Sequence, residues 1–236
     1  MDRNLNIHQQ KRILIVAPHP DDESIGCGGL LALYGKQCDI LLLTDGSKGH
    51  ASDFAGDEGE LVKIREQELK NAAELAEVQE VHMLRIPDGD LFSHYNVVKK
   101  IDIRSYDYVF VPNRREAHED HRVSYRMLKK LKKEQRAKAI LVEYEVWTPL
   151  VEPTCFLDIS EVIDRKRRLI EQHESQIGDI DYASKGVGLS CYRGIHINVD
   201  YAEAYYIEKQ RGIVKHISSR IPKAWKRKIK RVLKKS

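Results

Sequence analysis

The fold of this 236-residue chain is constrained most by a series of short apolar segments that alternate with amphipathic ones. The apolar segments are rich in branched residues and end at turn residues, which indicates strands. They are RILIVA from Arg12, DILLLT from Asp39, VHMLRI from Val81, YVFVP from Tyr108 and AILVEY from Ala139. Helices are expected between them at 26–34, 61–76 and 121–133. Apolar strands that alternate with helices form parallel sheets covered on both faces. The sequence therefore predicts an α/β fold, with a Rossmann-like, doubly wound, mostly parallel sheet and helices on both faces.

The remaining residues extend this layer without suggesting a second folded domain. Four further elements are expected: a strand at TCFLDIS, a charged helix over about 161–174, a glycine-bearing loop over 178–188, and a short apolar element near Tyr205. We therefore expect one domain over 1–210, followed by a basic tail over 211–236.

The net charge of +4 is unevenly distributed. Residues 221–236 carry eight basic side chains and no acidic one, so the preceding residues carry about −4. Within the tail Trp225, Ile229, Val232 and Leu233 recur at helical spacing, a pattern typical of peripheral association with an anionic membrane surface. A solvated, disordered end is the alternative. Nucleic-acid binding is not favoured, because the domain itself is not basic.

The cysteines and apolar runs bear on the compartment. The four cysteines are far apart and form no CxxC pair, so neither a disulfide framework nor a thiolate zinc site is indicated. The longest apolar runs are too short to span a bilayer, and the first residues lack the apolar core of a signal peptide. We expect a cytoplasmic protein. Cys27 is not expected to be an activated thiol.

Two of the strand-to-helix loops are unusually rich in titratable groups. PHPDDES follows the first strand and PNRREAHEDH follows the fourth. In doubly wound sheets these two strands commonly flank the point where the strand order reverses, and ligands bind outside their carboxyl ends. The sequence therefore predicts that the two loops face one another across one crevice.

The residues that meet in this crevice suit a catalytic metal. Two imidazoles and a carboxylate bind Zn²⁺ and leave coordination positions open. His19 and Asp22 are three residues apart with Pro20 between them, and His121 would complete the set. Taken alone, an Asp-Asp pair before a helix is most often an N-cap. The presence of both loops at matched positions favours the metal site.

The neighbouring side chains suggest acid–base chemistry. Asp21 diverges from Asp22 and could accept a proton from the attacking water, whose pKa the ion lowers. His118 would point toward the substrate, where a histidine can stabilise developing charge or protonate a leaving amine. Asp120 or Glu119 is expected to orient His118.

These motifs resemble a known family. PHPDDE followed by GCGG, with HEDH about a hundred residues later, is similar to the LmbE-like, or PIG-L, family of zinc-dependent N-acetylglucosaminyl deacetylases. Weaker matches occur at REQELKNAAELAEV, PDGDL, EVW and KRRLIEQHESQ, so the resemblance covers about residues 12–206. The resemblance implies that His19, Asp22 and His121 bind the metal and that Asp21 is the general base. It also implies that His118, with Asp120 behind it, assists at the oxyanion or the leaving group.

The resemblance also implies sugar contacts by Arg65 and Asp88. The alternatives are a solvated helix face for Arg65 and an ordinary turn residue for Asp88. The chain departs from the family pattern in two places. Glu119 replaces the proline of HPDH and is expected to point to solvent, and the preceding loop contains Arg114 and Arg115, which could bind a substrate phosphate or carboxylate or remain solvated.

The resemblance implies hydrolysis of an N-acetyl group on an N-acetylglucosamine-type conjugate, a small molecule that could be a glycolipid or glycan precursor. The expected cofactor is Zn²⁺, and Fe²⁺ suits the same ligand set. One alternative is a non-haem Fe(II) enzyme, since its facial triad has the same ligand types, although that triad normally belongs to an all-β barrel. The other is a non-catalytic sugar-binding descendant of the fold.

Overall fold

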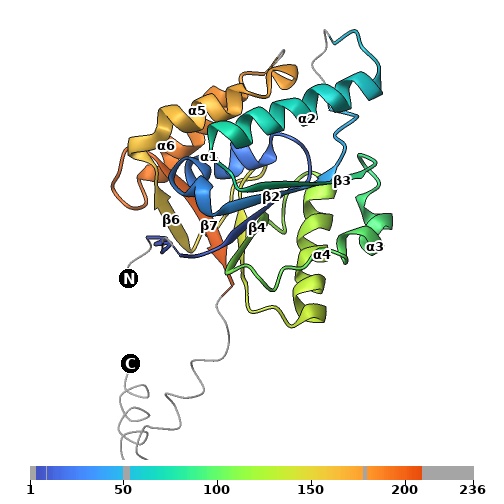
Figure 1. Ribbon diagram of the computed structural model, residues 1–236. Coiled ribbons are helices and arrows are strands. Elements are labelled where there is room, and N and C mark those ends of the chain that lie inside the picture. The colour runs from blue at the N-terminus through green and yellow to red at the C-terminus, as the bar shows by residue number, and fades with distance from the viewer. Residues whose placement is uncertain (1–3, 9, 50–53, 178–179, 209–236) are drawn as a thin grey trace, which may run out of the picture.

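The computed structural model describes residues 4–8, 10–49, 54–177 and 180–208 (Figure 1). Within them seven strands form one sheet: β1 (Ile13–Ala17), β2 (Cys38–Thr44), β3 (Glu80–Ile86), β4 (Tyr108–Pro112), β5 (Ile140–Tyr144), β6 (Cys155–Asp158) and β7 (Ala202–Ile207). The α-helices are α1 (Asp22–Tyr34), α2 (Glu58–Leu75), α3 (Tyr95–Val98), α4 (Glu119–Gln135), α5 (Ile163–Glu171) and α6 (Tyr182–Gly194). Short 3-10 helices lie at Gly35–Gln37, Leu91–His94, Ser160–Val162 and Glu174–Gln176.

The strand order of the sheet is β3-β2-β1-β4-β5-β7-β6. The first five strands are parallel, and β7 runs antiparallel to both β5 and β6. The predicted mostly parallel α/β sheet is therefore confirmed. β1 pairs with β4 as well as β2, so the strand order reverses between β1 and β4, as the doubly wound topology requires.

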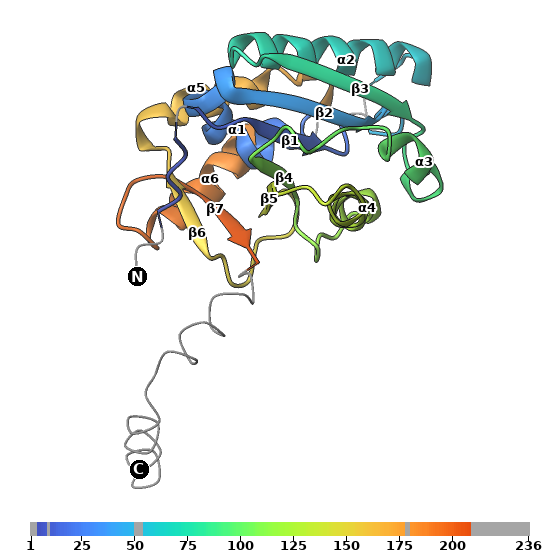
Figure 2. The ribbon, with the colours of Figure 1, turned by 60° about the horizontal axis from the view of Figure 1, so that its bottom comes forward.

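The two faces of the sheet pack against different helices (Figure 2). Because side chains alternate along a strand, Ile13 and Ile15 of β1 enter one core while Leu14 and Val16 enter the other. The first core includes apolar residues of α1, α2, α5 and α6, and the second includes those of α3 and α4. All five residues of β1 are buried, which explains its continuous apolar sequence.

The predicted loop over 178–188 is wrong, because most of it belongs to α6. The Asp181 side chain accepts a hydrogen bond from the Ser184 backbone amide and so caps this helix. The glycines that suggested a loop instead allow close packing. A Cβ on Gly186 would lie only 3.1 Å from Cδ1 of Ile170 in α5.

Helix α1 begins at Asp22, four residues before the predicted start, and is kinked at Cys27 (φ −130°, ψ 17°). Burial strongly raises the pKa of the Cys27 thiol, which agrees with its expected inertness. A Cβ on Gly26 would lie 2.3 Å from Cδ2 of Tyr144, so this glycine allows the helix to approach the sheet.

In the described part of the chain, no helix is long and apolar enough to cross a membrane. The predicted basic tail over 211–236 lies outside the described residues.

Candidate active site

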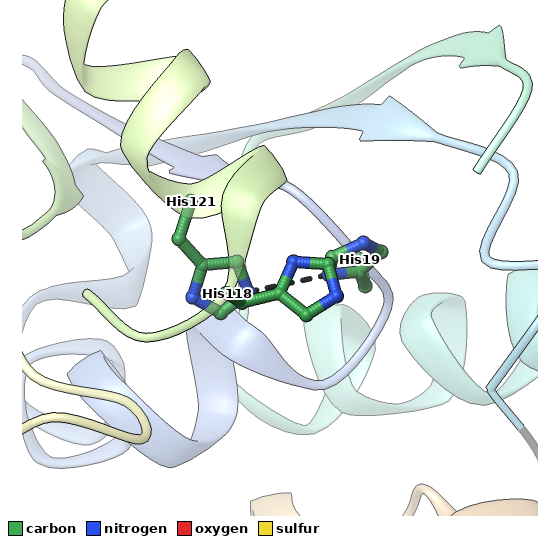
Figure 3. Close-up of side chains that lie close together, drawn as sticks. All are labelled: His19, His118 and His121. Carbon is green, nitrogen blue, oxygen red and sulfur yellow. Dashed lines mark hydrogen bonds between the residues drawn. The ribbon is translucent and has the colours of Figure 1, made fainter. Parts of the chain in front are cut away.

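The two titratable loops meet at the carboxyl ends of β1 and β4, as the predicted topology required. His19 lies in the turn between β1 and α1, while His118 and His121 lie at the start of α4 (Figure 3). The ring centroids of these histidines are 4.7–5.3 Å apart. Residues separated by about a hundred positions therefore form one compact cluster.

The three predicted metal ligands form a nearly equilateral triangle. Nε2 of His121 lies 3.2 Å from Oδ2 of Asp22 and 3.3 Å from Nδ1 of His19, and the third side, from His19 Nδ1 to Asp22 Oδ2, is also 3.3 Å. Ligand atoms about 2.0–2.1 Å from a tetrahedral Zn²⁺ lie roughly 3.3–3.4 Å from one another. The triangle therefore has the dimensions of one face of a tetrahedral metal site.

Carboxylates lie beside the second nitrogen of both imidazoles. Nε2 of His19 lies 3.3 Å from Asp88 Oδ1 and 3.4 Å from Asp120 Oδ2, and Nδ1 of His121 lies 3.9 Å from Glu116 Oε2. Carboxylates in such places orient histidine ligands. Sequence reasoning missed Glu116, although it lies in the same acidic loop. His19, Asp88 and Asp120 could also form a ligand group of their own, but the tighter triangle has the better fit.

The charges of the cluster favour a bound cation. Burial would raise the pKa of Asp22, but His121 and His19 outweigh it and lower that pKa. Burial would likewise lower the pKa of His121, yet Asp22 raises it to about 9. The pKa of His19 is also raised, despite burial, by its three carboxylate neighbours. The carboxylates thus stabilise positive charge at both imidazoles, and a bound divalent ion would supply that charge in place of the two protons.

Asp21 has an unusual backbone conformation for a residue with a side chain, with φ of 132° and ψ of −29°. It occupies the N-cap position of α1, but its side chain makes no capping hydrogen bond, so the N-cap explanation is wrong for Asp21. Burial raises the pKa of its carboxyl to about 6, despite the Arg65 guanidinium 3.4 Å away. A strained backbone and a raised carboxyl pKa are both typical of functional sites.

Arg65 is buried at 2% exposure, so the solvated-helix alternative is wrong. Its guanidinium donates to the backbone carbonyl oxygens of Pro20 at 2.6 Å and Gly46 at 2.7 Å. Arg65 therefore joins the loop that contains Asp21 to the loop that follows β2. The contact of Arg65 with a sugar stays a prediction.

His118 and Asp120 contact one another through the backbone of Asp120. Nδ1 of His118 accepts a hydrogen bond from the Asp120 backbone amide at 3.3 Å, and burial together with His19 and His121 lowers the His118 pKa. A neutral His118 therefore carries its proton on Nε2. The Asp120 carboxylate accepts from the Gly89 amide at 2.9 Å and faces His19, so the contact between Asp120 and His118 described here is made by the Asp120 backbone amide.

Asp88 is buried and holds the turn after β3 against the site. Its Oδ2 accepts from the Lys48 backbone amide at 3.2 Å, while Oδ1 faces His19. Burial would raise its pKa, but His19 contributes most to lowering that pKa to about 2. Asp88 is therefore more than a turn residue, because it contacts a predicted metal ligand.

The loop arginines differ in their surroundings. Arg114 donates to both carboxylate oxygens of Glu143, and its guanidinium lies 5.0 Å from the ring centroids of Tyr125 and Tyr206. It is thus engaged within the fold rather than free to bind a substrate anion. Arg115 is exposed. Glu119 is exposed as expected.

A cavity of about 370 Å³ lies beside the candidate site, between α1, α6, β7 and the loop after β5. Its lining is mostly apolar and includes Trp147 and Tyr182, whose rings are 5.2 Å apart. None of the eight predicted site residues lines it. The titratable cluster and this cavity are therefore distinct features.

Fold and site together define an α/β protein with a candidate metal centre at the switch point of a doubly wound sheet. The chain matches the family described as PIG-L, GlcNAc-PI de-N-acetylase, over residues 14–132. It belongs to this family, and the resemblance inferred from its motifs is confirmed.

Several relatives have names or structures that bear on function. Diacetylchitobiose deacetylase from Thermococcus kodakarensis is 32% identical over 188 residues, covering 70% of each chain. Probable N-acetyl-alpha-D-glucosaminyl L-malate deacetylase 2 from Bacillus subtilis is 30% identical over 190 residues, covering 71% of this chain and 84% of that protein. The structure of N,N'-diacetylchitobiose deacetylase from Pyrococcus horikoshii superimposes with a TM-score of 0.73 at 24% identity, covering 84% and 83% of the chains. That structural match shows a shared fold.

Proposed function

We propose that this protein is a metal-dependent hydrolase that removes the N-acetyl group from an N-acetylglucosamine-type conjugate, releasing acetate and a free amine. The observation that carries the proposal is the triangle of His19, Asp22 and His121, with Asp21 buried beside it. The two relatives named above, a diacetylchitobiose deacetylase and a probable N-acetyl-alpha-D-glucosaminyl L-malate deacetylase, support the same reaction on this class of sugar.

His19, Asp22 and His121 would hold the ion, which we propose to be Zn²⁺, with Fe²⁺ as the alternative for the same ligands. When bound, the ion would polarise the amide carbonyl and lower the pKa of the attacking water. Asp88 and Asp120 would fix the orientation of His19, and Glu116 that of His121.

Asp21 would take the proton of the attacking water, for which its raised pKa of about 6 is suitable at neutral pH. The neutral His118 presents Nε2–H, and it would donate this hydrogen bond to the oxygen on which charge develops. Proton delivery to the departing amine would complete the hydrolysis, with Asp21 returning the proton it accepted. Arg65 would hold the loop that contains Asp21 through its hydrogen bonds to Pro20 and Gly46. Arg65 and Asp88 would also contact the sugar.

The alternatives have less support. The facial triad of non-haem Fe(II) oxygenases normally lies in an all-β barrel, whereas this sheet is parallel and covered by helices. A sugar-binding protein without catalysis would have no use for the strain and burial cost of Asp21.

A substrate panel tests the proposal directly. The purified, Zn²⁺-loaded protein is incubated with N-acetylglucosamine conjugates that carry sugar, malate, inositol or lipid groups, and the free amine and acetate are measured. We expect equimolar release of both products from at least one conjugate, and release slower by about 10²-fold or more from Asp21→Asn that retains its metal. Absence of turnover across the panel, with one bound metal per chain, would contradict the proposal.

The basic tail over 211–236 suggests where the substrate resides. We propose that residues 221–236 bind an anionic membrane surface and that the substrate is lipid-linked, whereas a nucleic-acid partner is not favoured. Deletion of 221–236 should abolish sedimentation with anionic liposomes and leave turnover of a soluble conjugate unchanged. Equal sedimentation of the full and shortened chains would contradict this assignment.

A further inference from the structure

A second group of buried polar side chains contacts the backbone of Asp21. Nε2 of His173, in the turn after α5, lies 3.0 Å from Oε1 of Glu23 and 3.2 Å from Oγ of Ser24. Ser24 also donates to Glu23 Oε1 at 2.7 Å. His173, Glu23 and Ser24 are all buried, with at most 1% exposure.

The second oxygen of Glu23 connects this group to Asp21. Glu23 Oε2 accepts a hydrogen bond from the Asp21 backbone amide at 3.2 Å. The Asp21 carbonyl oxygen accepts from the amides of Ser24 at 3.0 Å and Ile25 at 2.9 Å. Both backbone polar groups of Asp21 are therefore held, and one of them is held by a buried carboxylate.

The conformation held in this way is costly for aspartate. With φ of 132°, Asp21 lies in a region that a glycine would occupy without strain and that other residues adopt only at a cost in free energy. A buried Glu23 would also be costly without partners. His173 and Ser24 are those partners, because both contact Oε1 of Glu23. They can therefore hold Glu23 where its Oε2 accepts a hydrogen bond from the Asp21 amide.

We propose that Glu23 and His173 are positioning residues, which hold Asp21 in its left-handed conformation and so aim its carboxylate at the reaction centre. This inference rests on the proposed function, since it assigns a purpose to the geometry of the general base. Among the described residues, the side chains of Glu23 and His173 bond to each other, to Ser24 and to the Asp21 amide rather than to the metal ligands. Their loss should therefore reduce turnover without removing the metal.

Two substitutions at one position test the proposal. In His173→Gln the side-chain amide nitrogen can reach the place of Nε2, whereas the shorter side chain of His173→Asn cannot. We expect His173→Asn to lower kcat by about 10–100-fold, the range typical when the groups that orient a site are lost. KM and metal content should stay within twofold of the unsubstituted protein, and His173→Gln should restore kcat to within about threefold.

Ser175→Ala is the matched control, because Ser175 lies in the same turn but bonds to Glu68, at 2.7 Å, rather than to Glu23. It should leave kcat unchanged. Glu23→Gln, which preserves size, is a second test if His173→Asn does not fold, and it should also lower kcat with metal retained. Wild-type kcat in both folded variants, or equal kcat loss in His173→Gln and His173→Asn, would overturn the proposal.

Hydrogen exchange supplies a readout that does not depend on turnover. Peptides covering 18–25 should exchange faster in His173→Asn than in His173→Gln or Ser175→Ala. Without His173, Glu23 is no longer held in place to accept the hydrogen bond of the Asp21 amide. Unchanged exchange in this segment would refute the positioning role even if the substrate were never found. Absent turnover with the expected exchange pattern would instead count against the proposed function alone.

Discussion

Two buried charged clusters lie along α1, and they differ in how completely their polar atoms are bonded. In the cluster at the start of the helix, Oδ1 of Asp22 has no hydrogen-bond partner. Nε2 of His19 and Nδ1 of His121 face carboxylate oxygens at 3.3 Å and 3.9 Å, but neither contact has the geometry of a hydrogen bond. Past the kink, Lys166 donates to the Ile25 carbonyl at 3.0 Å and to Glu203 at 2.7 Å.

Glu203 in turn accepts from the backbone amides of Gly29 at 2.6 Å and Leu30 at 2.9 Å, and from the Tyr205 hydroxyl at 2.6 Å. This second cluster replaces the helix hydrogen bonds that the kink at Cys27 breaks. Buried polar groups are normally satisfied, and those that are not require an explanation. The comparison therefore assigns the Lys166–Glu203 pair to structure, and it favours a functional role for the less completely bonded cluster of His19, Asp22 and His121.

The largest effect is expected from Asp22→Asn, which removes a proposed metal ligand. Metal content should fall well below one ion per chain, and turnover should fall by about a thousandfold or more, because the chemistry that the ion supplies is lost. The metal-free variant should unfold at a lower temperature than the metal-free wild type, because His19 and His121 lose the buried carboxylate that pairs with them. Metal analysis and thermal unfolding check this, and full metal occupancy in Asp22→Asn would contradict the ligand assignment.

Asp21→Asn should separate metal binding from catalysis. The amide cannot accept the proton of the attacking water, so kcat should fall by about 10²–10⁴-fold while the metal remains bound. Steady-state kinetics with metal analysis of the same sample measures both. Retention of more than a tenth of the wild-type kcat would contradict the role of Asp21 as general base.

Lys166→Met probes the other cluster, and the expected effect is on stability. Glu203 would be left buried without its cationic partner, which typically costs about 3–5 kcal/mol of unfolding free energy. Denaturant unfolding measures this loss, and kcat per metal-loaded folded chain should stay within a few-fold. The double variant Lys166→Met/Glu203→Gln should recover part of the stability. A Lys166→Met chain as stable as wild type would remove the contrast between the clusters.

The sequence predicted the five parallel strands and the meeting of the two loops, because apolar periodicity and the switch-point rule depend on local pattern and topology alone. It could not predict that Asp120 faces His19 or that Glu116 approaches His121. Those contacts depend on side-chain directions set by the turn before α4. The Lys166–Glu203 pair joins residues 37 positions apart, and neither has a local signal.

Glycines in two segments differ in how well the sequence predicted their structural role. At Gly26 the glycine allows the helix to approach the sheet closely, because Tyr144 leaves no room for a side chain. At 178–188 the glycines suggested a loop, whereas the capping contact of Asp181 and the packing of Gly186 on α5 produce a helix. Composition alone does not distinguish a glycine required by packing from one required by a turn.

The smallest effect is expected from Glu119→Pro, which restores the proline of the family motif next to His118 and tests whether the triangle depends on local charge. Glu119 is the first residue of α4 and is exposed. Proline is favoured at the first helical position, and the lower entropy of the unfolded chain is worth about 0.4–1 kcal/mol. Loss of a carboxylate near the positive end of the helix dipole costs a similar amount, about 0.3–1 kcal/mol. The two contributions should nearly cancel, so unfolding free energy should change by less than about 1 kcal/mol and kcat by less than twofold. A larger loss of kcat would show that the charge of Glu119 acts on the candidate site. The functional cluster would then include an exposed residue of α4 as well as the buried side chains.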